Sequence, residues 1–116
     1  MAREKRRAPR FHINQLIELE YGKESFVRAS GLNISEGGLL CKTEPYLAPS
    51  SRVFLSVHLS DDEIVNCEGI VVRSERRDDG SYAAISFVEF EGDAAARLVN
   101  FLKAQALASG ETKPTE

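Results

Sequence analysis

Apolar and polar residues alternate along most of the chain, a pattern typical of β-strands that bury one face. Near the N-terminus, Phe11, Ile17 and Tyr21 share one parity, whereas Glu18 and Glu20 have the other. Similar runs recur up to residue 90. The pattern predicts six short strands, at residues 11–21, 26–34, 39–42, 53–59, 64–76 and 82–90.

Turn-forming residues separate the predicted strands. Glycine, serine and charged residues occur at 22–25 and 36–38, and the Asp-Gly pair at 79–80 suits a hairpin position with positive φ. Gly31 and Gly69 lie inside predicted strands, where we expect a bulge and a bend, respectively. Such short connections favour antiparallel pairing between neighbouring strands.

The hydrophobic period lengthens to three or four residues after residue 92, as in a helix. Asp93 can cap this helix, and three alanines follow it. One helical stripe is formed by Leu98, Phe101, Leu102 and Gln105. Six short strands and one helix predict an all-β fold, a closed or nearly closed six-stranded antiparallel barrel with the C-terminal helix across one opening.

A length of 116 residues and a hydrophobic content of 42% support a single domain with a small core. Residues 1–10 lack periodicity and contain Pro9, so we expect a flexible basic arm. Residues 11–107 should form the barrel and its helix. Residues 108–116 are polar and should form a disordered tail.

The net charge of −3 is unevenly distributed. The arm carries five basic residues against one glutamate, a net +4, which leaves −7 for the rest of the chain. An acidic body does not suit duplex DNA, whereas a basic arm suits the capture of one small anion. No apolar segment follows the basic start, and no apolar run could span a membrane, so we expect a cytoplasmic protein without membrane insertion.

The sequence offers little for catalysis or metal binding. Cys41 and Cys67 lie in apolar segments without metal-ligand spacing, so we expect two buried thiols, with a disulfide as the alternative. His12 and His58 are the only histidines, and neither belongs to a catalytic or metal-binding pattern. The acidic residues at 61–63 indicate a solvated turn, with a metal site as the alternative. We therefore expect a binding protein with no catalytic residues and no metal site, rather than an enzyme.

Two arginines of the arm, Arg6 and Arg10, are separated by three residues that include Arg7. A guanidinium group forms bidentate bonds with a phosphate or with the O6/N7 edge of guanine, and it stacks on bases. Two arginines on one short arm can therefore hold both a phosphate and a guanine. The alternative is a solvated basic tail.

A second polar element combines Asn33, Ser35 and Gly38 within one turn. Asn and Ser offer short hydrogen-bonding groups, and glycine lets a ligand ring approach the backbone closely. One alternative is an ordinary turn with Asx hydrogen bonds. Another is a glycosylation site, which is disfavoured because no secretory signal precedes it.

Together, Arg6-x-x-x-Arg10 and Asn33-x-Ser35-x-x-Gly38 resemble the motifs of the PilZ family, and the predicted order of elements over residues 5–104 resembles it as well. The resemblance implies a cyclic di-GMP receptor. It assigns phosphates and guanine Hoogsteen edges to Arg6 and Arg10. It assigns the polar edge of a guanine on the barrel surface to Asn33 and Ser35, with Gly38 forming the turn.

Two further residues are candidates for the same site. Arg7 is an extra contact from the arm, and Arg73, late in the fifth predicted strand, would present a cation beside the same face. For Arg73 the alternative is a solvated strand charge near Glu75. Ala84 is a departure from the resemblance, because many family members have a glycine midway along the last strand. This difference concerns barrel packing more than the ligand motif.

Three functions remain. The first is a cyclic di-GMP receptor or adaptor that changes its protein-interaction surface when the nucleotide binds. The second is a PilZ-like module that binds only proteins, which the intact motifs disfavour. The third is a nucleic-acid-binding barrel, which the acidic body and the absence of Trp disfavour. We expect a bacterial monomer with an unidentified downstream partner, and no cofactor besides the nucleotide ligand.

Overall fold

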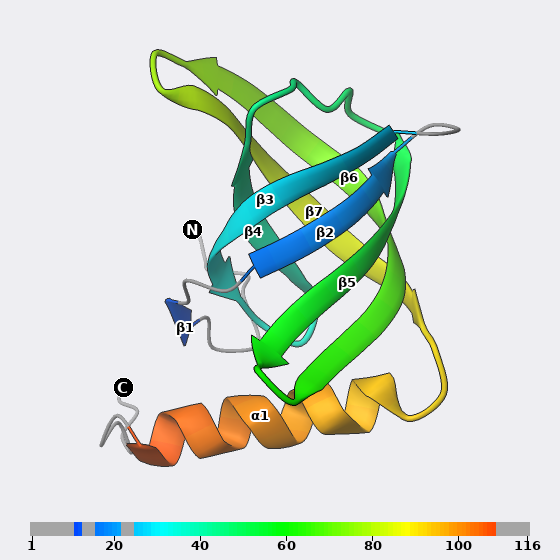
Figure 1. The fold of residues 1–116 in the computed structure, drawn as a ribbon, viewed down its shortest axis with the longest axis vertical. Helices are drawn as coiled ribbons and strands as arrows, with labels where there is room; N and C mark the ends of the chain where they lie inside the picture. Colours follow the sequence, from blue (N-terminus) through cyan, green and yellow to red (C-terminus); the bar gives the residue numbers. More distant parts are fainter. Residues whose placement is uncertain (1–10, 13–15, 22–24, 109–116) are drawn as a thin grey trace, which may run out of the picture.

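The computed structural model describes residues 11–12, 16–21 and 25–108 of the chain. Strands make up most of this part, and one helix follows them (Figure 1). The elements are β1 (Phe11–His12), β2 (Leu16–Tyr21), β3 (Ser25–Ile34), β4 (Gly38–Thr43), β5 (Arg52–Ser60), β6 (Glu63–Arg77), β7 (Gly80–Phe90) and α1 (Ala94–Ala108).

Six of the strands close into a barrel in the order β3-β2-β5-β6-β7-β4, because β4 also pairs with β3. Every pairing is antiparallel, and the short β1 lies beside β3. Closure leaves these strands without an unpaired edge, which suits a domain of this size. The predicted six-stranded antiparallel barrel with a C-terminal helix is confirmed.

The alternation in the sequence becomes the inside and the outside of the barrel. In β5, Val53, Leu55 and Val57 are buried in the core, whereas Arg52 and Phe54 are exposed. Burying one such apolar side chain contributes roughly 1.5–3 kcal/mol. The pattern of β5 recurs along β2 and β6, so every wall of the barrel contributes one face to a single core.

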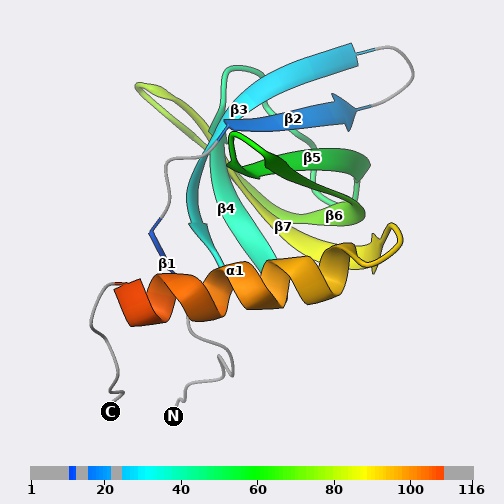
Figure 2. The same ribbon diagram turned by 60° about the horizontal axis from the view of Figure 1, so that its bottom comes forward.

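Helix α1 closes one end of this core. Ala94, Leu98 and Leu102 belong to the buried cluster, and the helix runs across one end of the barrel (Figure 2). At its N-terminus, Arg97 donates a hydrogen bond from Nε to Asp93 Oδ1 (3.0 Å) and another to the carbonyl of Ile64 on β6 (3.0 Å). The predicted helical stripe therefore packs on the barrel.

Two of the irregularities in the ladders fall where glycines lie within predicted strands. The register between β3 and β4 shifts between Gly31 and Asn33, and that between β6 and β7 shifts between Glu68 and Gly69. At Gly69 a Cβ would lie 2.7 Å from Ile85 Cγ2, so the core leaves no room for a side chain there. The bulge expected at Gly31 and the bend expected at Gly69 both correspond to register shifts.

Some boundaries differ from the prediction or lie outside the described residues. The segment predicted as one strand, residues 11–21, contains β1 and β2, and residues 13–15 between them lie outside the described residues. Helix α1 ends at Ala108, the first residue of the segment predicted as a tail. The arm, residues 1–10, and residues 109–116 are not among the described residues. Within the part that is described, no helix has the length and apolarity needed to cross a membrane.

Both cysteines are buried and unbonded, as expected for structural thiols. Cys41 faces inward from β4 and Cys67 from β6. Burial raises the pKa of each thiol from 9.0 to about 12. Neither thiol is therefore a thiolate near neutral pH, and both behave as small apolar core residues.

Candidate functional site

The turn between β3 and β4 is held together by the serine and the glycine of the predicted motif. Ser35 is only 6% exposed. The Gly37 N–H donates to Ser35 Oγ (3.2 Å), and the Ser35 N–H donates to the Gly38 carbonyl (2.9 Å). The Ser35 hydroxyl also approaches the Gly38 carbonyl, at 3.5 Å. Its hydrogen-bonding capacity is thus largely used within the turn.

Gly38 is required by close packing between strands. A Cβ at this position would lie 2.2 Å from the carbonyl oxygen of Ile85 on β7, and contacts of real Cβ atoms essentially never fall below 3.0 Å. Gly37, one residue earlier, has open space around it. The glycine of the motif therefore lets β4 approach β7 next to the turn.

Asn33 lies at one end of a row of residues that crosses four strands of the barrel. It faces Leu40 on β4, Leu40 faces Ala84 on β7, and Ala84 faces Arg73 on β6. Directly opposed residues on antiparallel strands place their side chains on the same side of the sheet. The adjacent row of Ile34, Leu39, Ile85 and Val71 is buried, so the row from Asn33 to Arg73 lies on the outer face.

Two register shifts place the polar ends of this outer row. Between Gly31 and Asn33 the pairing with β4 skips Leu32, and between Val71 and Arg73 the pairing with β7 skips Val72. A bulge of this kind changes which side chain faces a neighbouring strand. Without the two shifts, Leu32 and Val72 would take the places opposite Leu40 and Ala84. The bulges therefore bring Asn33 and Arg73 onto the same outer face.

A second outer row follows the first, and it was not foreseen from the sequence. Lys42 on β4 faces Tyr82 on β7, which faces Glu75 on β6. Lys42 Nζ lies 3.2 Å from Asp79 Oδ2, and the Tyr82 hydroxyl donates to the same oxygen at 2.8 Å. Both hydrogen bonds lower the pKa of the Asp79 carboxyl, and the bond from Tyr82 has the larger effect.

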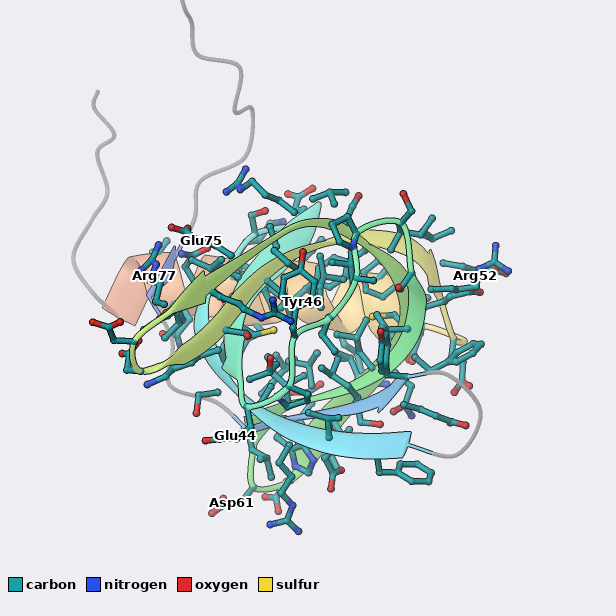
Figure 3. The ribbon with its side chains drawn as sticks, turned by 90° about the horizontal axis from the view of Figure 1, so that it is seen from above. Glu44, Tyr46, Arg52, Asp61, Glu75 and Arg77 are labelled. Carbon is teal, nitrogen blue, oxygen red and sulfur yellow. The ribbon has the colours of Figure 1, made fainter. Side chains whose placement is uncertain are left out.

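Arg77, two residues after Glu75 on β6, stacks on the aromatic ring of this row. Its guanidinium carbon lies 4.1 Å from the centroid of Tyr82, and its Nη2 lies 3.1 Å from Glu75 Oε1. Figure 3 shows Glu75 and Arg77 together, on the side of the barrel away from Arg52. The hydrogen bond from Arg77 is the main cause of the lowered pKa of Glu75, and the charge of Arg73 adds to it. The register of the β6–β7 hairpin brings these side chains together.

The remaining residues of the predicted site are the arginines of the arm. Arg6, Arg7 and Arg10 lie outside the described residues. Their chain joins the barrel at β1, where His12 faces Asn33, so it enters at the Asn33 end of the outer row. Among the described residues, no group of three or more His, Cys, Asp or Glu side chains is arranged to hold a metal ion.

Comparison with known proteins then decides the family. A family model described as the PilZ domain matches residues 4–104, most of the chain. The chain belongs to the PilZ domain family. A search of curated proteins finds no match. The match spans both polar motifs, so the resemblance inferred from them is confirmed.

Solved structures share the fold of this PilZ domain. The PilZ domain of YcgR from Escherichia coli, solved with c-di-GMP, has a TM-score of 0.72 at 11% identity, covering 94% of this chain and 100% of that one. The Bacillus subtilis inhibitor of motility, MotI/DgrA, has a TM-score of 0.76 at 16% identity, over 90% of this chain and 52% of that one.

A third structure is the MrkH–c-di-GMP complex of K. pneumonia, with a TM-score of 0.70 at 21% identity, over 95% of this chain and 56% of that one. This PilZ domain thus spans about half the length of MotI/DgrA and MrkH. At these identities the likeness establishes the fold.

Proposed function

We propose that this PilZ domain is a cyclic di-GMP receptor that binds the nucleotide between its basic arm and the outer row from Asn33 to Arg73. The observation that carries the proposal is this row, in which two bulges place an amide and a guanidinium on one outer face beside the point where the arm begins. The YcgR and MrkH structures with c-di-GMP support the choice of ligand.

The row has the chemistry of a nucleotide surface. It spans three strand intervals, roughly 14 Å. Leu40 and Ala84 give it a half-buried apolar centre on which a purine face can rest, and the Asn33 amide at one end can donate to and accept from a guanine edge. At the other end, Arg73 is exposed and supplies a positive charge. Polar groups thus flank an apolar platform.

The arm can reach this row. Arg10 lies two residues before His12, the partner of Asn33, so its backbone is within about 7 Å of His12, and Arg6 is within about 20 Å of His12 when the chain is extended. We propose that Arg6 and Arg10 bind phosphates and guanine Hoogsteen edges, with Arg7 as an additional contact. Ser35 would contribute chiefly by holding the turn, because its hydroxyl is already bonded there.

Ligand binding would then order the arm. Five basic residues in residues 1–10 repel one another, and the two phosphates of the nucleotide offset this repulsion. The docked arm, the nucleotide and the barrel would form a composite surface that a partner recognises only in the bound state. In this proposal the protein acts as an adaptor and catalyses no reaction.

Calorimetric titration of the full chain with cyclic di-GMP tests the nucleotide site. Arg10→Ala should weaken binding about tenfold to a hundredfold, because a charge-assisted bidentate contact contributes about 1.5–3 kcal/mol. Arg28→Ala is the matched control, since Arg28 is an exposed arginine on β3, five residues from Asn33. Cyclic di-AMP should compete poorly, because adenine places an amino donor where guanine has O6.

Two results would contradict the site assignment. One is unchanged affinity in both Arg6→Ala and Arg10→Ala, and the other is equal affinity for the two dinucleotides. Absence of binding to the parent protein would favour a module that binds only proteins. For the ordering of the arm, amide hydrogen exchange should show increased protection at residues 5–12 and 33–38 when cyclic di-GMP is added, with little change in β5 and α1.

A further inference from the structure

A stripe of alternating phenylalanine and glutamate crosses the barrel far from the proposed nucleotide row. Phe26 on β3 faces Glu20 on β2, Glu20 faces Phe54 on β5, and Phe54 faces Glu68 on β6. Glu68 in turn faces Glu89 on β7. We call these five residues the Phe/Glu stripe. Their opposed positions place all five side chains on the outer face.

The phenylalanines of the stripe are unusually exposed. Phe26 is 77% exposed and Phe54 is 53% exposed, although each ring would be stabilised by burial. Both line a groove of about 860 Å³ that runs over this wall of the barrel. A groove with exposed aromatic side chains is a typical protein-interaction surface.

The charge of the groove selects the kind of partner. Five glutamates line it, among them Glu18 and Glu91, against the single cation Arg28. Within the described part of the chain, Glu20, Glu89 and Glu91 form no ion pair. This surface repels phosphates and favours a cationic segment.

The β6–β7 hairpin of the same protein shows what such a pair of side chains binds. There, Glu75 faces Tyr82, and Arg77 stacks on the ring while it pairs with the carboxylate. The Phe/Glu stripe repeats this combination of an aromatic ring facing a glutamate. Among the described residues, no guanidinium stacks on Phe26 or Phe54.

We propose that the Phe/Glu stripe is a docking surface for an extended, arginine-bearing segment of a protein partner. Guanidinium groups of the segment stack on Phe26 and Phe54 and pair with Glu20 between them. The two rings are two strand intervals apart, about 10 Å. Arginines three positions apart in a polyproline II segment lie on one face, about 9.3 Å apart, and match this spacing.

One carboxylate of the Phe/Glu stripe, that of Glu68, already pairs with a cation of the same chain. Arg52 Nε lies 2.6 Å from Glu68 Oε2, as an ion pair. The geometry is not that of a hydrogen bond, and this buried oxygen accepts none within the described residues. Because this oxygen is buried and lies against Arg52, an incoming guanidinium does not reach it, and Glu20 is the first carboxylate of the stripe open to a partner.

The two arginines of the arm that are proposed to bind the nucleotide are poor occupants of the stripe. Phe26 lies eight residues along β3 from Ile34, the partner of Phe11, which corresponds to about 26 Å. Arg6 lies five residues before Phe11, so it extends at most about 18 Å from it. The arginines proposed to bind the nucleotide therefore stay on their own side of the barrel. The stripe shares no residue with the nucleotide row, so this inference stands apart from the proposed function.

The test is a titration of the ¹⁵N-labelled full chain with the peptide Gly-Arg-Pro-Pro-Arg-Gly, followed by amide chemical shifts. We expect saturable shifts, with a Kd of about 1 mM or tighter, confined to residues 18–20, 26–28, 54–56 and 66–68. Phe26→Ala and Phe54→Ala should each weaken binding about two- to fivefold. Both side chains are exposed, so the folds should be unchanged.

Matched controls separate this site from general charge attraction. Glu20→Gln should weaken binding, whereas Asp61→Asn, which removes an exposed acid of the β5–β6 turn, should not. A peptide with lysine in place of both arginines should bind more weakly, because an ammonium group neither stacks nor bonds in a bidentate manner.

Several results would overturn the proposal. These are an absence of shifts at millimolar peptide, shifts centred on residues 33–42, equal binding of the lysine peptide, and an equal effect of Asp61→Asn. Shifts of the stripe resonances on dilution without peptide would assign the surface to a second copy of the chain. Shifts of the same resonances in Arg3→Ser/Lys5→Ser would assign it to the arm.

Discussion

Replacing Gly38 by alanine tests the packing that holds the candidate nucleotide site. The new Cβ would lie 2.2 Å from the Ile85 carbonyl oxygen and 3.2 Å from both the Ile85 carbonyl carbon and Ser86 Cα. All three are backbone atoms of β7, and Gly38 faces Ser86 in the ladder. The clash cannot be relieved by a side-chain rotation, so the two strands must separate by roughly 0.8 Å or more to restore a contact of 3.0 Å.

The expected cost follows from two opposing effects. Overpacking in a tightly packed region typically costs about 1–3 kcal/mol, and separating the strands also strains the β4–β7 hydrogen bonds. The lower backbone entropy of alanine in the unfolded chain stabilises the folded state by about 0.4–1 kcal/mol and offsets part of this cost. We therefore expect Gly38→Ala to lose about 1–2 kcal/mol of the free energy of unfolding, which lowers Tm by about 4–8 °C for a domain of this size.

Gly37→Ala provides the matched control, one residue away. Gly37 has no atom within 4 Å of an added Cβ, and its φ is not in the positive range that penalises a side chain. This variant should match the parent within about 0.5 kcal/mol, or exceed it. Urea unfolding of the three proteins measures the difference. Equal stabilities for Gly38→Ala and Gly37→Ala would refute the packing argument.

Three further predictions concern the core, its thiols and the outer row. Leu98→Ala should lose about 2–5 kcal/mol in urea unfolding because this side chain is buried between α1 and the barrel, whereas Leu107→Ala, at an exposed position, should change stability by less than about 0.5 kcal/mol. Because burial raises the pKa of Cys41 and Cys67 to about 12, the unfolded chain releases these protons first, so stability should fall as the pH rises from about 9 towards 12. The fall should be smaller in Cys41→Ala/Cys67→Ala, and an identical pH profile would contradict a thiol origin. Arg73→Ala should reduce the affinity for cyclic di-GMP in calorimetry without changing Tm, and an unchanged affinity would assign Arg73 to the solvated pairing with Glu75.

The sequence by itself determined the strands and their inward faces, and it left open whether the barrel was closed or nearly closed. Alternation with a period of two depends only on neighbouring residues. It can be recognised in the sequence because each strand buries one apolar face. In the same way, the Asp-Gly pair indicated a hairpin, and Gly80 indeed has a φ of 139°. The polar motifs could be recognised because Asn33, Ser35 and Gly38 lie within one short segment.

Only the tertiary structure decided which residues of different strands lie side by side. The glycine at position 31 indicated the bulge next to it, but nothing in the apolar pattern located the bulge at Val72. The two bulges together determine that Asn33 and Arg73 reach one outer row. The burial of the Ser35 side chain within its turn was likewise not foreseen.

The Phe/Glu stripe illustrates the same limit, since its members come from five strands. A parity pattern can show that Phe54 points outward, but not that it faces Glu20 and Glu68. Side-chain parity is a local property of each strand, whereas register depends on turns, bulges and closure around the whole barrel. A change of register by one residue would leave every local pattern intact and would still place different side chains next to one another.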